Sequence, residues 1–166
     1  LALSKYGINV IGIPATIDND ISCTNYCIGF DTAANTAIEC IDKLRDTMQS
    51  HERCSVVEIM GRGAGWMTLH AGIAGAADVI LIPEIPYDIN KVAEKINNDK
   101  ANGKNYSIVA VAEGAKALGG KQIVSKIIED SADSIRLGGV GAVVADQLEK
   151  LTGSEARATT LGHIQR

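Results

Sequence analysis

The sequence predicts an α/β fold in which a largely parallel sheet is flanked by helices on both faces. Short apolar runs rich in β-branched residues recur along the chain, as expected of buried strands. Between them lie segments whose apolar residues repeat every three or four positions, as on one face of a helix. Strands that alternate with helices favour a parallel sheet, because each connection has to cross back over a face of that sheet. The 166 residues are enough for a domain with a hydrophobic core.

The expected strands are apolar runs bounded by Gly, Pro or polar residues. They lie at residues 8–13, 54–60, 78–82, 106–112 and 156–161. The expected helices lie at residues 31–50, 66–75, 90–102 and 141–151. Asp31 is a suitable N-cap for the first helix, and Gly103 a suitable stop for the third. Residues 116–137 are ambiguous, and Gly119-Gly120 suggests a loop that precedes a further helix.

Polar or Gly-rich loops follow four of the expected strands. They lie at residues 16–20, 61–62, 113–114 and 162–166. Ligands of parallel α/β sheets bind at the carboxyl ends of the strands. We therefore expect these four loops to converge on one active site.

Two acidic residues occupy the first of these loops. Asp18 and Asp20, beside the Thr16 hydroxyl and the Asn19 amide, could hold a cation, position a hydroxyl group or accept a proton. The alternative is an Asx-type turn, since Asp and Asn side chains bond readily to nearby backbone groups. The spacing alone leaves both interpretations open.

The basic residues of the loops are suited to phosphate. Arg62 lies among alternating glycines that do not form the GxGxxG pattern, and it could stabilise a phosphate or a developing negative charge. His163 and Arg166 directly follow the last expected strand, which favours a phosphate pocket. Taken singly, each of these residues, like Arg53 and Arg157, could instead be a surface charge or, for His163, a structural histidine.

Composition argues against several classes of protein. The net charge of −4 disfavours a general nucleic-acid-binding surface, and no apolar stretch reaches the roughly 18–20 residues that cross a bilayer. The four cysteines lack zinc-type spacing, so we expect reduced thiols and a cytoplasmic location. The chain starts at Leu1 rather than Met and ends at Arg166 inside a candidate binding motif, so we expect a fragment of a longer protein.

Four motifs, taken together and in this order, resemble the signature set of the 6-phosphofructokinase family. They are GIPATIDND at 12–20, IGFDTA at 28–33, MGR at 60–62 and GHIQR at 162–166. The resemblance implies a Rossmann-like three-layer fold within a longer two-domain chain. Residues 1–30 would close the nucleotide-binding domain and carry the catalytic loop, and residues 31–166 would form an incomplete fructose 6-phosphate-binding domain.

The resemblance also implies a role for each matching residue. Asp18 matches the base that takes the proton from the sugar 1-hydroxyl, and Thr16 and Arg62 complete the catalytic set. Asp20 matches a neighbour of the magnesium site, whose main ligand lies outside this chain. The implied substrate contacts are Thr16, Ile17, Asp18, Arg53, Met60, Gly61, Arg62, Glu113, Arg157, His163, Ile164, Gln165 and Arg166.

A shared site and regulation follow from the same resemblance. Arg53 and Arg157 match positions that reach into the site of a neighbouring subunit, so we expect a homo-oligomer, either a tetramer or a dimer. Arg45 and Lys104 match basic positions of an effector site, although Asn102 stands where such relatives carry Lys. The alternative for these charges is a solvated place at helix ends and loops. The expected partners are small-molecule substrates, with neither nucleic acid nor a membrane.

The implied activity is that of an ATP-dependent 6-phosphofructokinase, which converts fructose 6-phosphate to fructose 1,6-bisphosphate in glycolysis. ATP is the expected co-substrate and Mg²⁺ the cofactor. Pyrophosphate is the alternative donor, but relatives that use it usually carry Lys where this chain has Ala15. The family's upstream GGDGS segment has no match here, so this chain alone is expected to be inactive. A catalytically silent sugar-phosphate-binding or regulatory module is the alternative of another class, against which the intact Asp18 speaks.

Overall fold

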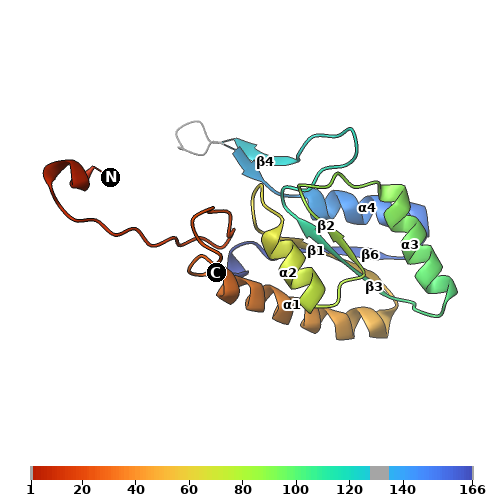
Figure 1. Cartoon of the computed structure of the whole chain (residues 1–166). Coiled ribbons are helices and arrows are strands. Elements are labelled where there is room, and N and C mark those ends of the chain that lie inside the picture. The colour runs from red at the N-terminus through yellow and green to blue at the C-terminus, as the bar shows by residue number, and fades with distance from the viewer. Residues whose placement is uncertain (1, 128–134, 166) are drawn as a thin grey trace.

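The computed structural model describes residues 2–127 and 135–165 (Figure 1). Its centre is a parallel four-stranded sheet in the order β2 (Val79–Leu81), β3 (Ser107–Ala112), β1 (Cys54–Ile59) and β6 (Ala156–Thr160). The connecting helices are α1 (Phe30–His51), α2 (Trp66–Ala74), α3 (Ile89–Ala101) and α4 (Val140–Thr152). The predicted α/β architecture with a parallel sheet is confirmed.

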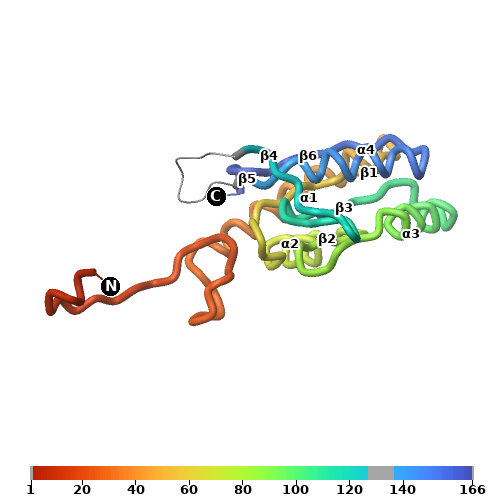
Figure 2. The backbone as a smooth tube through the Cα atoms, turned by 90° about the horizontal axis from the view of Figure 1, so that it is seen from above, coloured from red at the N-terminus to blue at the C-terminus, as the bar shows by residue number. Residues whose placement is uncertain are grey.

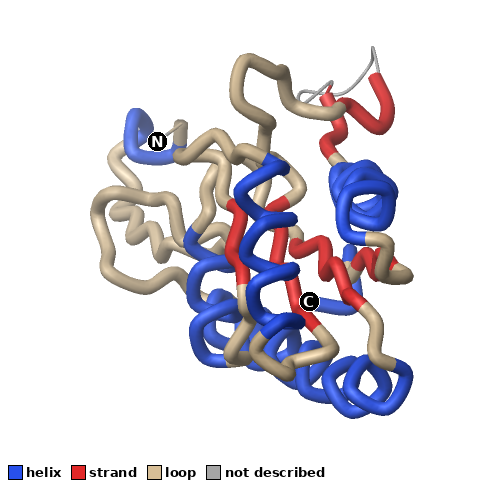
Figure 3. The backbone as a smooth tube through the Cα atoms, turned by 90° about the vertical axis from the view of Figure 1, so that its right-hand side faces the viewer, coloured by secondary structure: helices blue, strands red, loops and turns tan. Residues whose placement is uncertain are grey.

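Helices lie on both faces of the sheet (Figure 3). Two hydrophobic cores lie between the sheet and these helices, one on each face. Ile41 of α1 and Met67 of α2 belong to one core, and Leu148 of α4 belongs to the other. Successive residues of β1 alternate between the cores, since Val56 packs with α4 and Val57 with α1 and α2. A strand covered on both faces needs apolar residues at even and at odd positions alike, because successive side chains point to opposite faces. This requirement explains the continuous apolar runs.

The boundaries of the predicted helices, and of four predicted strands, differ from the observed ones by at most one residue at either end. Gly103 follows the end of α3 with a positive φ of 90°, as expected of a helix stop. The N-cap prediction is wrong, because Gly29 caps α1 with φ 100° and Asp31 lies inside the first turn. The buried Phe30 opens the helix, and the chain enters it through a conformation that glycine adopts without strain. In the described parts of the chain, no helix combines the length and the hydropathy that crossing a bilayer requires.

The predicted strand at residues 8–13 is absent. This segment follows the short 3₁₀ helix η1 (Leu3–Tyr6) and extends away from the body as an arm (Figures 1 and 2). Its side chains are exposed, with Ile11 at 91% and Ile13 at 70%. The β-branched composition suits a strand, but a strand also needs neighbouring backbone groups, and no described strand pairs with this segment.

The described residues of the ambiguous segment, 116–127 and 135–137, form a second, smaller sheet and no helix, and residues 128–134 lie outside the described residues. β4 (Val124–Ile127) and β5 (Ile135–Leu137) pair in the antiparallel sense. The loop suggested by Gly119 is present, since this glycine adopts φ 73°. Ile123 and Val124 are β-branched, which disfavours a helix and favours extended backbone. The pairing of β4 with β5 decides between helix and strand here, and the periodicity of the local sequence does not reveal that pairing.

Candidate active site

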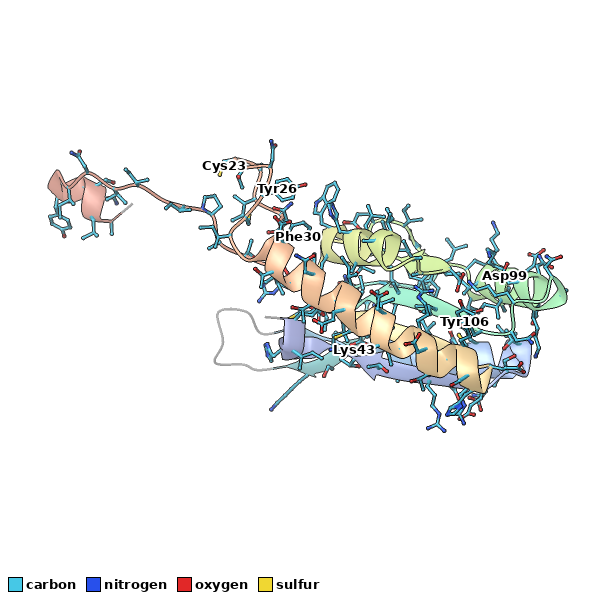
Figure 4. All side chains as sticks on the ribbon, turned by 90° about the horizontal axis from the view of Figure 1, so that it is seen from below. Cys23, Tyr26, Phe30, Lys43, Asp99 and Tyr106 are labelled. Carbon is cyan, nitrogen blue, oxygen red and sulfur yellow. The ribbon has the colours of Figure 1, made fainter. Side chains whose placement is uncertain are left out.

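The loop of residues 14–29, termed the 14–29 loop, leads from the arm into α1. Cys23 and Tyr26 lie on it, just before Phe30 opens the helix (Figure 4). The two ends of the loop are joined, because the Ile28 N–H donates to the Pro14 carbonyl at 3.0 Å. The first candidate motif is therefore held in a closed loop beside the N-terminus of α1.

Asn19 closes this loop from inside. Its φ is 52°, and its side chain accepts from the Cys27 N–H at 2.8 Å and donates to the Asn25 carbonyl at 3.1 Å. A second bond runs from the Asp18 N–H to the Thr16 hydroxyl oxygen at 3.2 Å. Side-chain closure of the loop thus rests on Asn19 and Thr16, and the Asp18 main chain takes part through its N–H.

The Asp18 carboxyl lies in an environment that favours its neutral form. Burial is the largest cause that raises the pKa of Asp18 above its usual range, and the charge of Asp20 adds to it. The Arg62 guanidinium acts in the opposite direction and lowers the pKa. Because Arg62 belongs to the turn after β1, the structure brings the 14–29 loop and that turn to one region. A carboxylate with a raised pKa is a stronger proton acceptor than an ordinary Asp side chain.

The turn after β1, residues 60–65, is termed the strand-end turn. From the β6 side, Gln165 is fully buried and lies on the Met60 main chain. Its Oε1 accepts from the Met60 N–H at 2.8 Å, and its Nε2 donates to the Met60 carbonyl at 3.4 Å. The first residue of the strand-end turn is thereby fixed at both of its peptide groups.

From the β3 side, Glu113 and Gly114 fix the middle of the strand-end turn. Glu113 Oε1 accepts from the Gly61 N–H at 3.3 Å and from the Arg62 N–H at 2.8 Å. A Cβ atom at Gly114 would lie 2.0 Å from the Arg62 carbonyl oxygen, so a glycine is required there. Arg62 itself adopts φ 44°, a conformation that such contacts have to support.

From the β2 side, Glu84 fixes the end of the strand-end turn. Its Oε1 accepts from the N–H of Gly65, the N-cap residue of α2, at 2.8 Å. A Cβ atom at Gly65 would lie 2.6 Å from the Ile82 Cβ, so the turn passes close to the end of β2. The segment that follows each of the other three strands of the main sheet therefore contributes one polar side chain that holds this turn.

The last motif lies on η2 (Gly162–Gln165), the 3₁₀ helix after β6. Gly162 turns the chain with φ 51°, and His163 and Ile164 are exposed beyond it. The Gln165 bonds to Met60 place η2 beside the strand-end turn. Arg166 lies outside the described residues. Contacts of these residues with substrate remain predictions.

Glu58 is a buried acid whose role the sequence analysis missed. It lies in β1 with 2% exposure, and its carboxylate accepts from the Gly139 N–H at 3.1 Å and from the Gly141 N–H at 2.7 Å. A helix N-terminus attracts anions, and at α4 the anion is this internal side chain. The sequence did offer one indication of this role, because Glu58 is the single acidic residue in an otherwise largely apolar strand. The Gly-rich stretch before α4 is thus explained by the close approach of Glu58.

Arg53 and Arg157 lie at the opposite, amino edge of the sheet. Both bind Glu155, with Arg53 Nε at 2.5 Å and Arg157 Nε at 2.7 Å from its carboxylate oxygens. The hydrogen bond from Arg157 is the main cause that lowers the pKa of Glu155. Because β1 spans six residues, Arg53 lies roughly 20 Å from Met60, and Arg157, which pairs with Ser55 of β1, lies roughly 15 Å from it. Within one chain, these two arginines are therefore not brought to the region of Asp18.

Arg45 and Lys104, the residues expected at an effector site, converge on the turn between α2 and β2. Arg45 donates to the Gly75 carbonyl and, at 3.3 Å, to the Ala76 carbonyl. Lys104 forms an ion pair with Asp78 at the end of the same turn. The two cations thus stabilise a turn at the amino edge, and an effector there remains a prediction. Asn102, where a Lys was expected, is the C-cap of α3.

Asp20 faces a pocket of about 540 Å³ between the 14–29 loop and α2. The wall is formed by Asn19, Asp20, Ile21, Ser22, Thr24, Asn25, Tyr26, Trp66 and His70. Mg²⁺ usually binds one or two carboxylates and completes its shell with water and phosphate oxygens. Among the described residues, no group of three His, Cys, Asp or Glu side chains could hold a metal ion. A magnesium site that uses Asp20 would therefore need further ligands from elsewhere, and it remains a prediction.

Comparison with known proteins gives a consistent family. Residues 1–166 match a family model described as phosphofructokinase. An ATP-dependent 6-phosphofructokinase 2 of Clostridium perfringens is 54% identical over 98% of this chain and 45% of its own length. A pyrophosphate–fructose 6-phosphate 1-phosphotransferase of Amycolatopsis methanolica is 48% identical over 99% of this chain and 48% of its own length. The chain thus spans a little under half the length of these curated relatives.

Solved structures show the same likeness. The phosphofructokinase of Saccharomyces cerevisiae superposes with a TM-score of 0.78 and 34% identity, over 93% of this chain and 19% of that chain. A pyrophosphate-dependent phosphofructokinase from Marinobacter aquaeolei superposes with a TM-score of 0.78 and 25% identity, over 99% of this chain and 40% of that chain. The fold therefore agrees with that of proteins described as phosphofructokinases, one of them as pyrophosphate-dependent.

Proposed function

Because this chain belongs to the phosphofructokinase family, we propose that the protein phosphorylates the 1-hydroxyl of fructose 6-phosphate, with ATP as the donor. The product would be fructose 1,6-bisphosphate, which makes the reaction a step of glycolysis. The observation that carries the proposal is that the charge of Arg62, from the turn after β1, acts on the carboxyl of Asp18 from the 14–29 loop and lowers its pKa. A base and a phosphate-binding cation from two separate loops are what transfer to a hydroxyl group requires.

Asp18 is the proposed general base. Its raised pKa supports this role, because the carboxylate must take the proton of the sugar hydroxyl as the phosphoryl group arrives. Arg62 would stabilise the negative charge on the transferring group, and Glu113 holds the main chain from which it extends. Thr16 would line the path of the phosphoryl group, since its hydroxyl already bonds to the Asp18 main chain.

The sugar phosphate would bind across the same edge. His163 and Arg166 are proposed to bind the 6-phosphate, with Ile164 beside them on η2. Ile17, Met60 and Gly61 are proposed to line the sugar. Glu113 is proposed to accept sugar hydroxyls through its second carboxylate oxygen, because its Oε1 already accepts from the strand-end turn.

Mg²⁺ would supply charge neutralisation for the phosphates of the donor. Asp20 is the proposed ligand from this chain, since it faces the pocket next to Asp18. The remaining ligands would be donor phosphates, water and groups outside the described residues. Residues 1–30 would then close the nucleotide-binding domain, and residues 31–166 would form the sugar-phosphate-binding domain.

ATP is proposed over pyrophosphate because of Ala15, which carries no charge and leaves room for a nucleotide. Pyrophosphate is kept as the second candidate donor, since relatives described under both donors align with nearly the whole chain. The deciding experiment measures turnover of fructose 6-phosphate by the full-length protein with each donor in turn, at equal Mg²⁺. Faster turnover with pyrophosphate would reverse the assignment. Calorimetric binding of fructose 6-phosphate without turnover by either donor would favour a silent binding module.

The proposed assembly is a cytoplasmic homo-oligomer, either a dimer or a tetramer, with sites shared between subunits. Arg53 and Arg157 would bind the sugar phosphate held by a neighbouring subunit. Their place towards the amino edge supports this, because Arg53 lies roughly 20 Å, and Arg157 roughly 15 Å, from the strand-end turn of their own chain. Arg45 and Lys104 are proposed for effector binding on the α2–β2 turn.

A further inference from the structure

The sheet ladder between β1 and β6 is completed by a side chain. The β6 backbone follows β1 as far as Leu161, whose N–H donates to the Glu58 carbonyl at 3.0 Å. Gly162 then turns the chain out of the sheet with φ 51°. The next backbone groups of β1, those of Met60, would be left without a partner on that side. The Gln165 amide supplies both bonds, to the Met60 N–H at 2.8 Å and to the Met60 carbonyl at 3.4 Å.

The environment of Gln165 leaves its amide little other use. The residue is fully buried, so water does not compete for its polar atoms. Buried amides persist where their bonds are satisfied within the protein. A side chain that is covered on all sides and bonded to main chain at both ends is poorly placed to reach a ligand. Its neighbours on η2, His163 and Ile164, are exposed instead.

We infer that Gln165 is a positioning residue, which ties η2 to the strand-end turn and so fixes the separation of His163 and Arg62. This inference rests on the proposed function, and it gives Gln165 a supporting role in place of the direct substrate contact that the sequence implied. The 6-phosphate and the reacting 1-hydroxyl lie at opposite ends of the sugar. Groups that grip the two ends have to keep a fixed distance if the hydroxyl is to meet the phosphoryl group.

The test compares Gln165→Met with Gln147→Met in the full-length enzyme. Met keeps the volume and removes both amide bonds. Gln147 is the matched control, because it lies on α4 and its Oε1 is a buried atom without a hydrogen-bond partner in the described residues. In the Gln165 variant, amide hydrogen exchange at Met60 should accelerate about tenfold or more, since one main-chain bond is lost. Exchange at Met60 in the Gln147 variant should equal that of the wild type.

The kinetic readout separates positioning from stability. Well below the melting temperature, Gln165→Met should lower kcat about tenfold and raise the KM for fructose 6-phosphate, because His163 and Arg62 both shift relative to the substrate. Faster exchange with unchanged kcat and KM would overturn the inference. If the wild type fails to turn over fructose 6-phosphate, the proposed function fails, and the exchange comparison still tests the bond between η2 and Met60.

A double variant tests the route of the effect. If Gln165 acts through the strand-end turn, Gln165→Met should lower kcat by a smaller factor in an Arg62→Ala background than in the wild type. Equal factors in both backgrounds would overturn the inference. If Gln165→Met does not fold, Gln165→Glu replaces it, because Glu keeps the acceptor for the Met60 N–H and loses the donor to the Met60 carbonyl. The expected loss of kcat for Gln165→Glu is smaller than the roughly tenfold loss expected for Gln165→Met. Unchanged kcat and KM would again overturn the inference.

Discussion

The two edges of the central sheet use polar side chains in different ways. At the carboxyl edge, Glu113 and Gln165 accept N–H groups of the strand-end turn, so their oxygens hold main chain. At the amino edge, Arg53 and Arg157 share the carboxylate of Glu155, so charged side chains hold one another. The first arrangement fixes the place from which a side chain acts. The second consists of partly exposed ion pairs, which add little stability and open at low cost.

This contrast explains how one chain could serve two sites. Rigid main chain suits the groups that perform chemistry, because reorganisation during the reaction lowers the rate. Arginines in open ion pairs suit a group that a neighbouring subunit's ligand could recruit. Substitutions at the carboxyl edge should therefore change turnover, and substitutions of the amino-edge arginines should change affinity.

The largest effect is expected from Asp18→Asn, which keeps the size of the side chain and removes its basicity. Turnover of the full-length enzyme should fall roughly 10²–10⁴-fold, while affinity for fructose 6-phosphate and melting temperature stay near the wild-type values. Asp31→Asn is the control, because Asp31 is an exposed acid in the first turn of α1. Steady-state kinetics, calorimetry and thermal melts on the same preparations check the prediction. Near-normal turnover of the Asp18 variant would remove the proposed base.

The next effect concerns stability at the centre of the sheet. Glu58→Ala should lower the free energy of unfolding by about 3 kcal/mol, because two charge-assisted bonds to the start of α4 are lost and the buried Gly141 N–H is left without its acceptor. Glu94→Ala, at an exposed position of α3, should change it by less than about 0.5 kcal/mol. Urea unfolding measures both. Equal losses would mean that α4 does not depend on this internal anion.

A smaller effect is expected at the amino edge, where Arg157→Ala should weaken the apparent affinity for fructose 6-phosphate about tenfold. Mixing Arg157→Ala subunits with His163→Ala subunits provides the sharper test. If the site is shared, both lesions can fall in one site, and hybrids regain some intact sites. Verified hybrids that show no recovery would place Arg157 and His163 in the same chain's pocket and remove the contrast between the edges.

The smallest effect is expected at Cys54, at the start of β1. Burial, with the Asp78 charge as a second cause, raises the pKa of Cys54 from 9.0 to about 12. Above pH 9 the unfolded chain therefore loses a proton that the folded chain keeps, so stability should fall as pH rises from about 9 towards 12. Cys54→Val should flatten this decline in urea unfolding measured from pH 8 to 10. At pH 8, iodoacetamide should modify the exposed Cys23 and leave Cys54 intact; equal rates would contradict the assigned burial.

Local patterns were sufficient for most of the sheet and its helices, because burial between two helix layers imposes an apolar run on each strand and an apolar face on each helix. Local patterns failed where the structure of a segment depends on a partner that is distant in the sequence. The run at residues 8–13 has strand composition without a described neighbour, and Val124 finds its partner in the separate strand β5. Helix capping by Gly29 also depended on how the 14–29 loop approaches α1.

The meeting of the loops that follow β1, β3 and β6 was predictable, since strand ends meet at one edge whatever the loops contain. The supporting bonds were not. The bonds from Glu58 to α4 and from Gln165 to Met60 join residues 81 to 105 positions apart, and nothing in the spacing of either residue indicates a partner. Asn19 was likewise visible as a turn former, but its bond to Cys27 depends on the fold of the whole loop.

The bond between Met60 and Gln165 also sets an order of events during synthesis. The two residues are 105 positions apart, so a ribosome needs roughly 5–20 s to deliver the second after the first. During that interval α1, β1, α2 and β3 can assemble, while the end of β1 lacks its last partner. Closing so long a segment is entropically costly, although the cost grows slowly with length. The strand-end turn therefore acquires its final shape late, after β6 has docked, and a nascent chain halted before η2 would hold a nearly complete sheet with an unfinished strand-end turn.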